Sequence, residues 1–413
     1  MLSSEALHSY VEYYFNLSGK YMDTLMRHAS PLYILDTSIL RERAEQFKRA
    51  FHDVLPDTAF YYAMKSNNHP DVVRTLVCSD FGIDVSSGME LEQAVASGAK
   101  DIVFSGPGKT REELLLAVRY SDRVTVLIDS FGELARLEDI AAAEDKIIRA
   151  GVRLAASKGS LWRKFGITPE ELPLFREDTI KCSHINFCGL QFHCSWNRTP
   201  DAQVEFISTL GHILSGLPDL CREELEFIDI GGGYWPPQGE WLQPAGTREG
   251  KMKIGLGAEA GPATDHYCLP SAGIETFAEQ LHIALCQYIY PILSCKICFE
   301  PGRWICNDAM QVIMTVVDKK ADDLIITNAG TNTVGWDRFE TDYFPVLNLT
   351  RPSLQERECH IMGSLCTPHD VWGYTYWGDE IQEGDILMIP EQGAYTYSLR
   401  QHFIKPLPHV VTL

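Results

Sequence analysis

The chain has 413 residues, and 36 lysines and arginines stand against 56 aspartates and glutamates, which gives a formal net charge of −20. Hydrophobic residues make up 45% and charged residues 22% of the sequence, which is ordinary for globular proteins and excludes a disordered, fibrous or collagenous chain. The acidic excess disfavours sequence-independent binding of nucleic acid and attachment to an anionic membrane surface, because both need clustered lysine and arginine. At ~150 residues per domain the length predicts two to three domains, although one α/β barrel can reach ~250 residues.

The first 30 residues and the cysteines favour a cytoplasmic protein. The N-terminal segment lacks the basic and apolar regions of a secretory signal, and no run reaches the ~18 apolar residues of a membrane helix. The 12 cysteines are scattered along the chain, unlike those of a small disulfide scaffold. Cys295 and Cys298 form the only C-x-x-C pair and lack a second pair at zinc spacing, so we expect core cysteines and no metal site.

From about residue 32, short apolar runs alternate with amphipathic segments of helical period. The expected strands are 32–35, 60–64, 82–85, 101–104, 124–128, 148–154, 184–192 and 226–230, and the expected helices are 38–51, one after Pro70, 89–97, 111–120, 131–144 and 202–215. Roughly eight such strand–helix units precede residue 285, and they predict a parallel (β/α)8 barrel with right-handed crossovers.

The pattern changes after about residue 290. Strand-like runs at 295–300, 310–317, 324–327, 360–362, 385–389 and 395–398 follow one another with few helical segments between them. We therefore expect an α/β barrel over residues 32–285, and an antiparallel β-barrel domain over residues 286–413 with part of residues 1–31. Residues 236–272 are rich in glycine and proline without periodicity, which is typical of a functional or disordered loop.

Lys65 is the first candidate for chemistry. It follows an apolar strand in Y-Y-A-M-K-S-N-N, and the carboxyl ends of barrel strands face the active-site loops. A lysine in such a partly desolvated pocket can form a Schiff base. Taken alone, however, a lysine is more often a solvated surface charge.

The glycines Gly231, Gly232 and Gly233 directly follow another expected strand. Glycine lets the backbone approach a ligand closely and point N–H groups at a phosphate, but a plain strand-to-loop turn explains the run equally well. The run does not fit the dinucleotide-binding pattern G-x-G-x-x-G, because Pro236 occupies the position of the third glycine. The segment before Lys109 does not fit the Walker A pattern G-x-x-x-x-G-K, because Val103 occupies the position of the first glycine. These departures exclude a nucleotide triphosphate site.

Other candidates also lie near the ends of expected strands. Glu300 and Arg303 bracket the Pro-Gly turn of E-P-G-R, where they form either a charged site or a turn salt bridge. His193 follows an apolar strand, and a lone histidine is more often structural. Cys366 is a proton donor or a buried thiol, and Tyr395 offers a phenol beside a flexible turn.

The order of these motifs is more informative than any one of them. Y-A-M-K-S-N, D-V-S-S-G-M-E, S-G-P-G-K-T, F-H-C, I-D-I-G-G-G, E-P-G-R, G-S-L-C-T-P-H-D and G-A-Y follow one another between residues ~30 and ~405. Together they resemble the fold-type III pyridoxal-phosphate decarboxylases, the diaminopimelate/ornithine decarboxylase family. The resemblance implies an alanine-racemase-type (β/α)8 barrel with a C-terminal β domain. It also implies a homodimer whose active sites are shared between subunits.

The resemblance implies pyridoxal 5′-phosphate as the cofactor. Lys65 would hold it as a Schiff base, Asp84 would belong to its site, and His193 would stack on its ring. Glu300 would pair with the pyridine nitrogen and keep it protonated, since an opposite charge favours the charged form. The phosphate would be held by Gly231, Gly232, Gly233, Gly302 and Tyr395.

The substrate would be an amino acid or a molecule derived from one. Arg303 would lie on its side of the cofactor, and Cys366 of the partner subunit would give a proton to Cα, with Asp370 beside it. In the best-known relatives an acidic residue follows this cysteine and binds a distal ammonium, whereas this chain has Thr367. A hydroxyl cannot supply the same charge-assisted hydrogen bond.

The L-C-T-P-x-D pattern is similar to decarboxylases of specialised metabolism that act on conjugated or carrier-bound amino acids. It favours a bulky and often anionic conjugate, bound by Arg303, Thr367 and Asp370, with siderophore biosynthesis as the leading context. An ordinary diaminopimelate, ornithine or lysine decarboxylase remains an alternative if Asp370 alone holds the distal amine.

Two further alternatives concern the reaction itself. An amino-acid racemase could use the same fold, but alanine racemases place an arginine at the pyridine nitrogen, where this chain has Glu300. A non-catalytic, decarboxylase-like regulator would be expected to have lost cofactor residues, yet Lys65, His193, Glu300 and Cys366 are all present.

Overall fold

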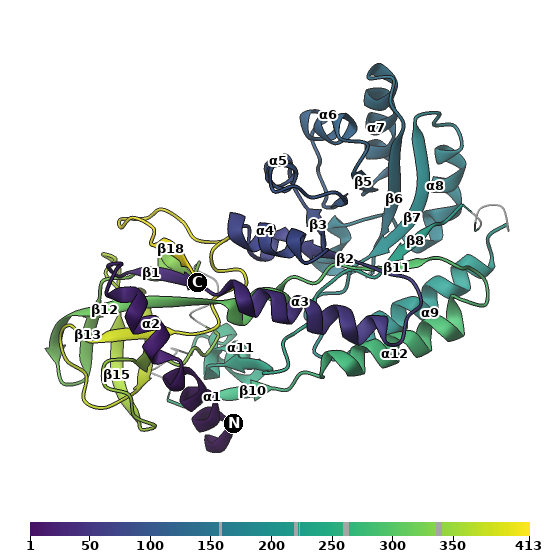
Figure 1. The fold of residues 1–413 in the computed structure, drawn as a ribbon. Coiled ribbons are helices and arrows are strands. Elements are labelled where there is room, and N and C mark those ends of the chain that lie inside the picture. The colour runs from purple at the N-terminus through teal and green to yellow at the C-terminus, as the bar shows by residue number, and fades with distance from the viewer. Residues whose placement is uncertain (157–158, 219–221, 223, 259–263, 336–340) are drawn as a thin grey trace. The chain divides into compact units, whose positions relative to one another are not determined.

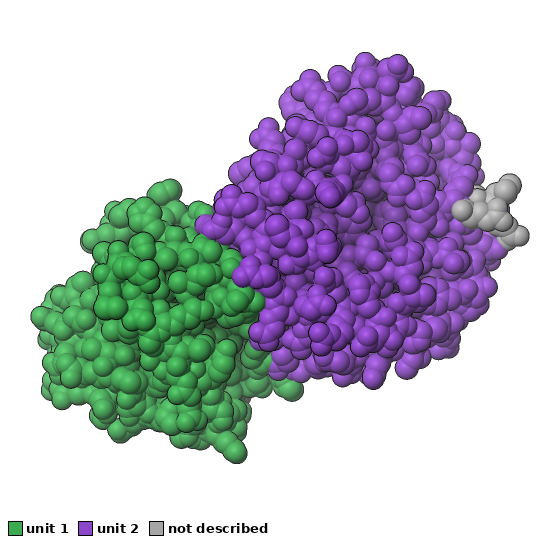
Figure 2. All heavy atoms as spheres, in the orientation of Figure 1, with its two compact units in different colours: residues 1–39, 238–270, 306–413 green, residues 40–237, 271–305 purple. Residues whose placement is uncertain are grey.

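The computed structural model describes residues 1–156, 159–218, 222, 224–258, 264–335 and 341–413. The chain forms two compact units, which Figure 2 shows in different colours. The barrel unit comprises residues 40–237 and 271–305, and the β unit comprises residues 1–39, 238–270 and 306–413.

The barrel unit is built on eight parallel strands that close on themselves, in the order β2-β3-β4-β5-β6-β7-β8-β11 (Figure 1). The strands are β2 (Thr58–Ala63), β3 (Gly82–Val85), β4 (Ile102–Phe104), β5 (Val124–Ile128), β6 (Ile148–Leu154), β7 (Ile185–Phe192), β8 (Phe227–Asp229) and β11 (Lys296–Phe299). Most of their residues are buried, as expected for strands covered on both faces. The predicted (β/α)8 barrel is confirmed.

Helices follow the strands and cover the barrel. They are α3 (Thr37–His52), α4 (Pro70–Cys78), α5 (Gly88–Ala96), α6 (Arg111–Arg119), α7 (Phe131–Ala143), α8 (Leu172–Thr179), α9 (Asp201–Ser215) and α12 (Ile274–Tyr288). Ser87, Thr110 and Ser130 cap the amino ends of α5, α6 and α7 with their side chains. These caps fix the residue at which each helix begins. The short segments between the end of a strand and the start of the next helix therefore lie at the mouth of the barrel.

Aromatic side chains fasten α3 to the strands where the barrel closes. The ring centroids of Phe51 and Phe299 lie 4.1 Å apart, and Phe60 stacks on Phe299 at 5.4 Å. Phe47 meets Trp304 at 5.4 Å. This packing holds β2 beside β11, the two strands that precede Lys65 and Glu300 in the sequence.

The β unit contains an eight-stranded sheet in the order β13-β15-β16-β14-β17-β12-β1-β18. Its strands are β1 (Leu32–Leu35), β12 (Met310–Ala321), β13 (Leu324–Thr327), β14 (Leu347–Asn348), β15 (Glu356–Met362), β16 (Val371–Trp377), β17 (Ile386–Ile389) and β18 (His409–Thr412). An additional pairing of β12 with β13 joins six of these strands into a ring. The predicted β-barrel domain is therefore present, but β1–β18, β13–β15 and β14–β16 are parallel pairs.

Two predicted strands lie in a different unit from the one that the sequence predicted. Residues 32–35, expected as the first barrel strand, form β1, which pairs with β12 and β18. Residues 296–299, expected in the β domain, form β11 and close the barrel against β2 and β8. Continuous apolar runs are typical of buried strands in either sheet, so periodicity could not assign the partner. The units consequently divide at residues 39/40 and 305/306 rather than at residue 285.

The segment expected as an irregular loop is partly regular. Residues 238–270 belong to the β unit and contain the antiparallel pair β9 (Glu240–Leu242) and β10 (Tyr267–Leu269), with α11 (Arg248–Gly255) between them. The β unit also contains α1 (Ser4–Asn16) and α2 (Ser18–Leu25), and α13 (Arg303–Cys306) spans its junction with the barrel unit. No helix within the described residues is long and apolar enough to cross a membrane.

Candidate active site

Lys65 lies at the carboxyl end of β2, in the helical turn Met64–Ser66. Its Nζ is 3.4 Å from Oδ2 of Asp84, which lies on the adjacent strand β3. The lysine side chain is 37% exposed, whereas the aspartate side chain is fully buried. Burial, and then the charge of Glu300, raise the pKa of Asp84 to about 6, although Lys65 opposes this shift.

The loop that follows β8 comes unusually close to His193. Gly231 has φ +70°, and a Cβ there would lie 2.5 Å from the carbonyl oxygen of Phe192 and 2.9 Å from Nδ1 of His193. A Cβ on Gly232 would lie 2.1 Å from the carbonyl oxygen of Glu300. Since no side chain fits at either position, these glycines allow β7, β8 and β11 to bring His193 and Glu300 together.

His193 is held as a neutral imidazole. The N–H of Gly232 donates to its Nδ1 at 3.2 Å, which leaves the ring proton on Nε2, 3.0 Å from Oγ of Ser195. Burial and the positive charges of Lys65 and Arg153 lower the pKa of His193 well below its usual range. A flat, uncharged ring therefore lies 3.7 Å from the carboxylate of Glu300 (Nδ1 to Oε2).

Glu300 is buried at the carboxyl end of β11, with 2% of its surface exposed. Nε2 of Gln191 donates to its two carboxylate oxygens at 3.3 and 3.4 Å. Asp229 is also fully buried, and burial together with the charge of Glu300 raises its pKa well above the usual range. Burial and the neighbouring acid therefore favour the neutral form of Asp229.

The glycine N–H groups are not all available for a phosphate. Gly231 donates to Oδ1 of Asp229 at 2.8 Å, and Gly232 donates to His193. The expectation that all three glycines hold the phosphate therefore needs correction: the first two shape the site. Within the described residues, the N–H groups of Gly233 and Gly302 donate no hydrogen bond, so they remain for an anion.

Gly302 and Arg303 extend the site along the loop after β11. A Cβ on Gly302 would lie 2.8 Å from Oγ of Ser66, the residue next to Lys65. The guanidinium carbon of Arg303 lies 4.4 Å from the centroid of the Trp235 ring. The structure thus brings Lys65, Asp84, His193, Glu300 and the glycines together at one end of the barrel.

The other predicted residues lie in the β unit. Cys366 is exposed, and Thr367 is half-buried in the turn between β15 and β16. Tyr395 has φ +57° and lies in a turn, where the sequence had predicted a strand over 395–398.

Asp370 differs from the expectation that it binds substrate. It is 1% exposed, and its Oδ1 accepts hydrogen bonds from the N–H and the hydroxyl of Thr331 at 2.7 and 2.9 Å. Its Oδ2 accepts the N–H of Leu365 at 2.6 Å. Oδ2 thus holds the loop that presents Cys366, while Oδ1 ties Asp370 to the turn that begins at Thr331, so both carboxylate oxygens are engaged within the β unit.

Sequence reasoning missed Gln191, Asp229 and Arg153. Gln191 lies two residues before His193, and residues two apart in a strand point to the same face of the sheet. This two-residue spacing could have identified Gln191 as a neighbour of His193 in the site. Asp229 precedes the glycines within the quoted motif I-D-I-G-G-G. Arg153 occupies the carboxyl end of β6 in no motif that singled it out.

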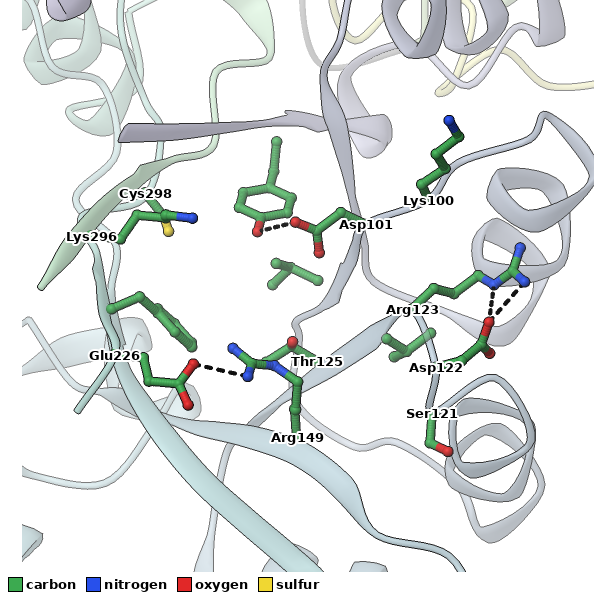
Figure 3. Close-up of a pocket in the computed structure, with 14 residues that line it drawn as sticks. Lys100, Asp101, Ser121, Asp122, Arg123, Thr125, Arg149, Glu226, Lys296 and Cys298 are labelled. Carbon is green, nitrogen blue, oxygen red and sulfur yellow. Dashed lines mark hydrogen bonds and ion pairs between the residues drawn. The ribbon is translucent and has the colours of Figure 1, made fainter. Parts of the chain in front are cut away.

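A separate cavity of about 370 Å³ lies at the amino ends of the barrel strands (Figure 3). Arg149 forms an ion pair with Glu226 at 2.9 Å in this cavity, and the hydroxyl of Tyr61 donates to Asp101 at 2.8 Å. None of the predicted site residues lines it. The chemistry-bearing groups are therefore at the carboxyl end, where barrel active sites lie.

The site fits pyridoxal 5′-phosphate. Lys65 would hold the aldehyde, His193 would cover the ring face and Glu300 would face the ring nitrogen. The N–H groups of Gly233 and Gly302 would bind the phosphate. When bound, this cofactor accepts the electron pair left on Cα after a bond to that carbon breaks. The carboxylate of Glu300 would favour the protonated form of the ring nitrogen, because an opposite charge stabilises the charged form. Fold and site thus define a pyridoxal-phosphate enzyme of the α/β-barrel class.

Comparison with known proteins identifies the family. The family model described as "Pyridoxal-dependent decarboxylase, pyridoxal binding domain" matches residues 38–307. The chain belongs to this family and is a pyridoxal-phosphate-dependent amino-acid decarboxylase, a carboxy-lyase.

Individual relatives cover most of the chain. Diaminopimelate decarboxylase of Methanothermobacter thermautotrophicus is 27% identical over 92% of this chain and 86% of its own length. The 2-[(L-alanin-3-ylcarbamoyl)methyl]-2-hydroxybutanedioate decarboxylase of Staphylococcus aureus is 25% identical over 84% of this chain and 86% of its own. The crystal structure of diaminopimelate decarboxylase from Helicobacter pylori complexed with L-lysine has a TM-score of 0.76 at 22% identity, and covers 95% of this chain and 94% of that one.

Proposed function

We propose that the enzyme removes the α-carboxylate from an amino acid carried in a larger, anionic conjugate, in siderophore or other specialised-metabolite biosynthesis. The observation that carries the proposal is the loop around Cys366. Thr367 stands where a distal ammonium would need an acid, and Asp370 is buried with both oxygens engaged. This loop therefore offers no carboxylate to a free diamino acid.

The staphylococcal relative supports this proposal by its name. Its substrate joins an amino-acid head to a hydroxybutanedioate, which is an anionic conjugate. The eleven described cysteines are all free, as in a reducing compartment, which supports a place in the cytoplasm.

Diaminopimelate decarboxylase is the second candidate. The relative from Methanothermobacter thermautotrophicus favours it, since that protein aligns with 92% of this chain. This function would require an acidic partner for the distal ammonium outside the 363–371 loop.

Release of CO₂ from purified holoenzyme tests the choice. We expect kcat/KM for 2-[(L-alanin-3-ylcarbamoyl)methyl]-2-hydroxybutanedioate to exceed the values for meso-diaminopimelate, ornithine and lysine by at least about 10-fold, the effect of one charge-assisted hydrogen bond. Thr367→Glu supplies the missing acid and should raise turnover of the free diamino acids by about 10-fold. Thr367→Gln, similar in size but neutral, is the control. Better turnover of a free diamino acid by the wild type would refute the proposal.

We further propose a homodimer in which Cys366 of one subunit serves the lysine site of the other as the proton donor to Cα. The exposure of Cys366 in the single chain supports this arrangement.

Mixing two inactive variants tests the shared site. Lys65→Ala and Cys366→Ala should each be inactive, but subunits exchanged at equal ratio should recover about a quarter of wild-type activity, because half of the dimers then hold one intact site. A mixture that stays inactive after confirmed subunit exchange would show that both residues act within one chain.

A further inference from the structure

A second cavity adjoins the cofactor site at the carboxyl ends of β6 and β7. It has a volume of about 220 Å³, and His193 forms part of its wall. The other side chains that matter are Arg153, Trp162, Phe165 and Trp196. The cavity therefore opens beside the ring position, where a substrate longer than the cofactor pocket would extend.

Arg153 is a buried cation that forms no ion pair within the described residues. It is 8% exposed, and within the described part of the chain no carboxylate lies within ion-pair distance of its guanidinium. The nearby Asp129 accepts the N–H of Gly166 at 3.0 Å. Burial raises the pKa of Asp129, and the charge of Arg153 opposes this shift without a direct contact between the two side chains. Burial of an unpaired charge is costly, so a guanidinium left facing a cavity indicates that an anion binds there.

The walls of the cavity are aromatic. The guanidinium carbon of Arg153 lies 4.4 Å from the Phe165 ring centroid, and Trp162 packs against Phe165 at 5.7 Å. Trp196 is 63% exposed and has φ +55°, a strained conformation for so bulky a residue. Such strain recurs at ligand-binding positions. An exposed tryptophan at the rim suits the flat amide of a conjugated substrate.

The groups needed by the cofactor are supplied elsewhere. Lys65, Glu300, His193, Gly233 and Gly302 match its aldehyde, ring nitrogen, ring face and phosphate, as described above. Arg153, Trp162 and Trp196 are not needed to bind any of these parts of the cofactor.

We propose that this cavity is a substrate subsite in which Arg153 pairs with a carboxylate at the distal end of the substrate, while Trp162 and Trp196 cover the linking chain. The subsite rests on the proposed function and deepens it. It assigns the anionic end of the conjugate to the carboxyl end of β6, rather than to the Cys366 loop.

The test compares two probes on the holoenzyme: 2-[(L-alanin-3-ylcarbamoyl)methyl]-2-hydroxybutanedioate, and its diamide with both butanedioate carboxylates amidated. For the wild type, kcat/KM should favour the acid by about 10- to 100-fold. Arg153→Gln should abolish that preference, chiefly by raising KM for the acid, and Arg153→Lys should restore part of it. Trp162→Ala and Trp196→Ala should raise KM for both probes several-fold.

Arg149→Gln is the matched control. Arg149 lies four residues earlier on β6 and lines the cavity at the other end of the barrel, where Figure 3 shows its ion pair with Glu226. This variant removes a guanidinium from the same strand and should leave the acid-to-amide ratio unchanged.

The outcomes separate the two proposals. Preference of the wild type for a free diamino acid over both probes would refute the proposed function. Preference for the conjugate with an acid-to-amide ratio unaffected by Arg153→Gln would overturn the subsite alone. Loss of the visible absorbance of bound cofactor in Arg153→Gln would assign Arg153 to the cofactor, which also overturns the subsite.

Discussion

Lys65→Ala should lower kcat by at least about 10³-fold and remove the visible absorbance of the covalently held cofactor. Lys65 is at the end of β2, 3.4 Å from the buried carboxylate of Asp84, and is placed to anchor the cofactor and to move protons at Cα. Steady-state CO₂ release and the absorption spectrum of the dialysed protein measure the two effects.

Lys100→Ala is the control for this experiment. Lys100 is an exposed lysine of the barrel unit that lines the cavity at the amino ends of the strands. We expect wild-type activity and spectrum for this variant. A Lys65→Ala protein that folds, keeps the spectrum and turns over normally would contradict the assignment of Lys65.

Glu300→Gln should lower kcat by about 10²- to 10³-fold while the cofactor stays bound. The amide keeps the shape of the side chain and its contact with Gln191, but it lacks the charge that holds a proton on the ring nitrogen. Single-turnover CO₂ release at saturating cofactor separates this chemical defect from weaker binding.

Glu226→Gln offers the matched control, since Glu226 pairs with Arg149 at the opposite end of the barrel. It should leave kcat within about twofold of wild type, because surface ion pairs contribute little. Wild-type kcat in Glu300→Gln would show that the carboxylate does not serve the ring nitrogen.

The sequence was sufficient to predict the barrel and the end of it that carries the chemistry. Alternation of apolar strands with amphipathic helices has one common solution, a parallel sheet with helices outside. Closing that sheet puts the carboxyl ends of all strands at one mouth, which agrees with the shared site that the family resemblance implied for Lys65, Asp84, His193 and Glu300.

Partners in space were harder to predict than positions in sequence. Nothing in L-Y-I-L at residues 32–35 indicates pairing with β12 rather than with β2, because both neighbours bury the same apolar faces. The hydrogen bonds that Asp370 accepts from Thr331 and Leu365 likewise depend on partners that the C-T-P-H-D pattern does not indicate. Arg153 became informative only because no carboxylate of the described residues lies within ion-pair distance of it, and no single sequence records such a distance.

The protonation of the buried acids also depends on tertiary structure. Asp84 and Asp229 lie on β3 and β8, and the charge of Glu300, which follows β11, reaches both of them. Burial raises the pKa values of the two aspartates.

Reductive trapping tests the central claim most directly. Borohydride reduction of the holoenzyme, followed by digestion and mass spectrometry, should place a phosphopyridoxyl group on the peptide that contains Lys65. Recovery of the label on another lysine, such as Lys109, or of no labelled peptide from spectrally intact holoenzyme, would contradict it.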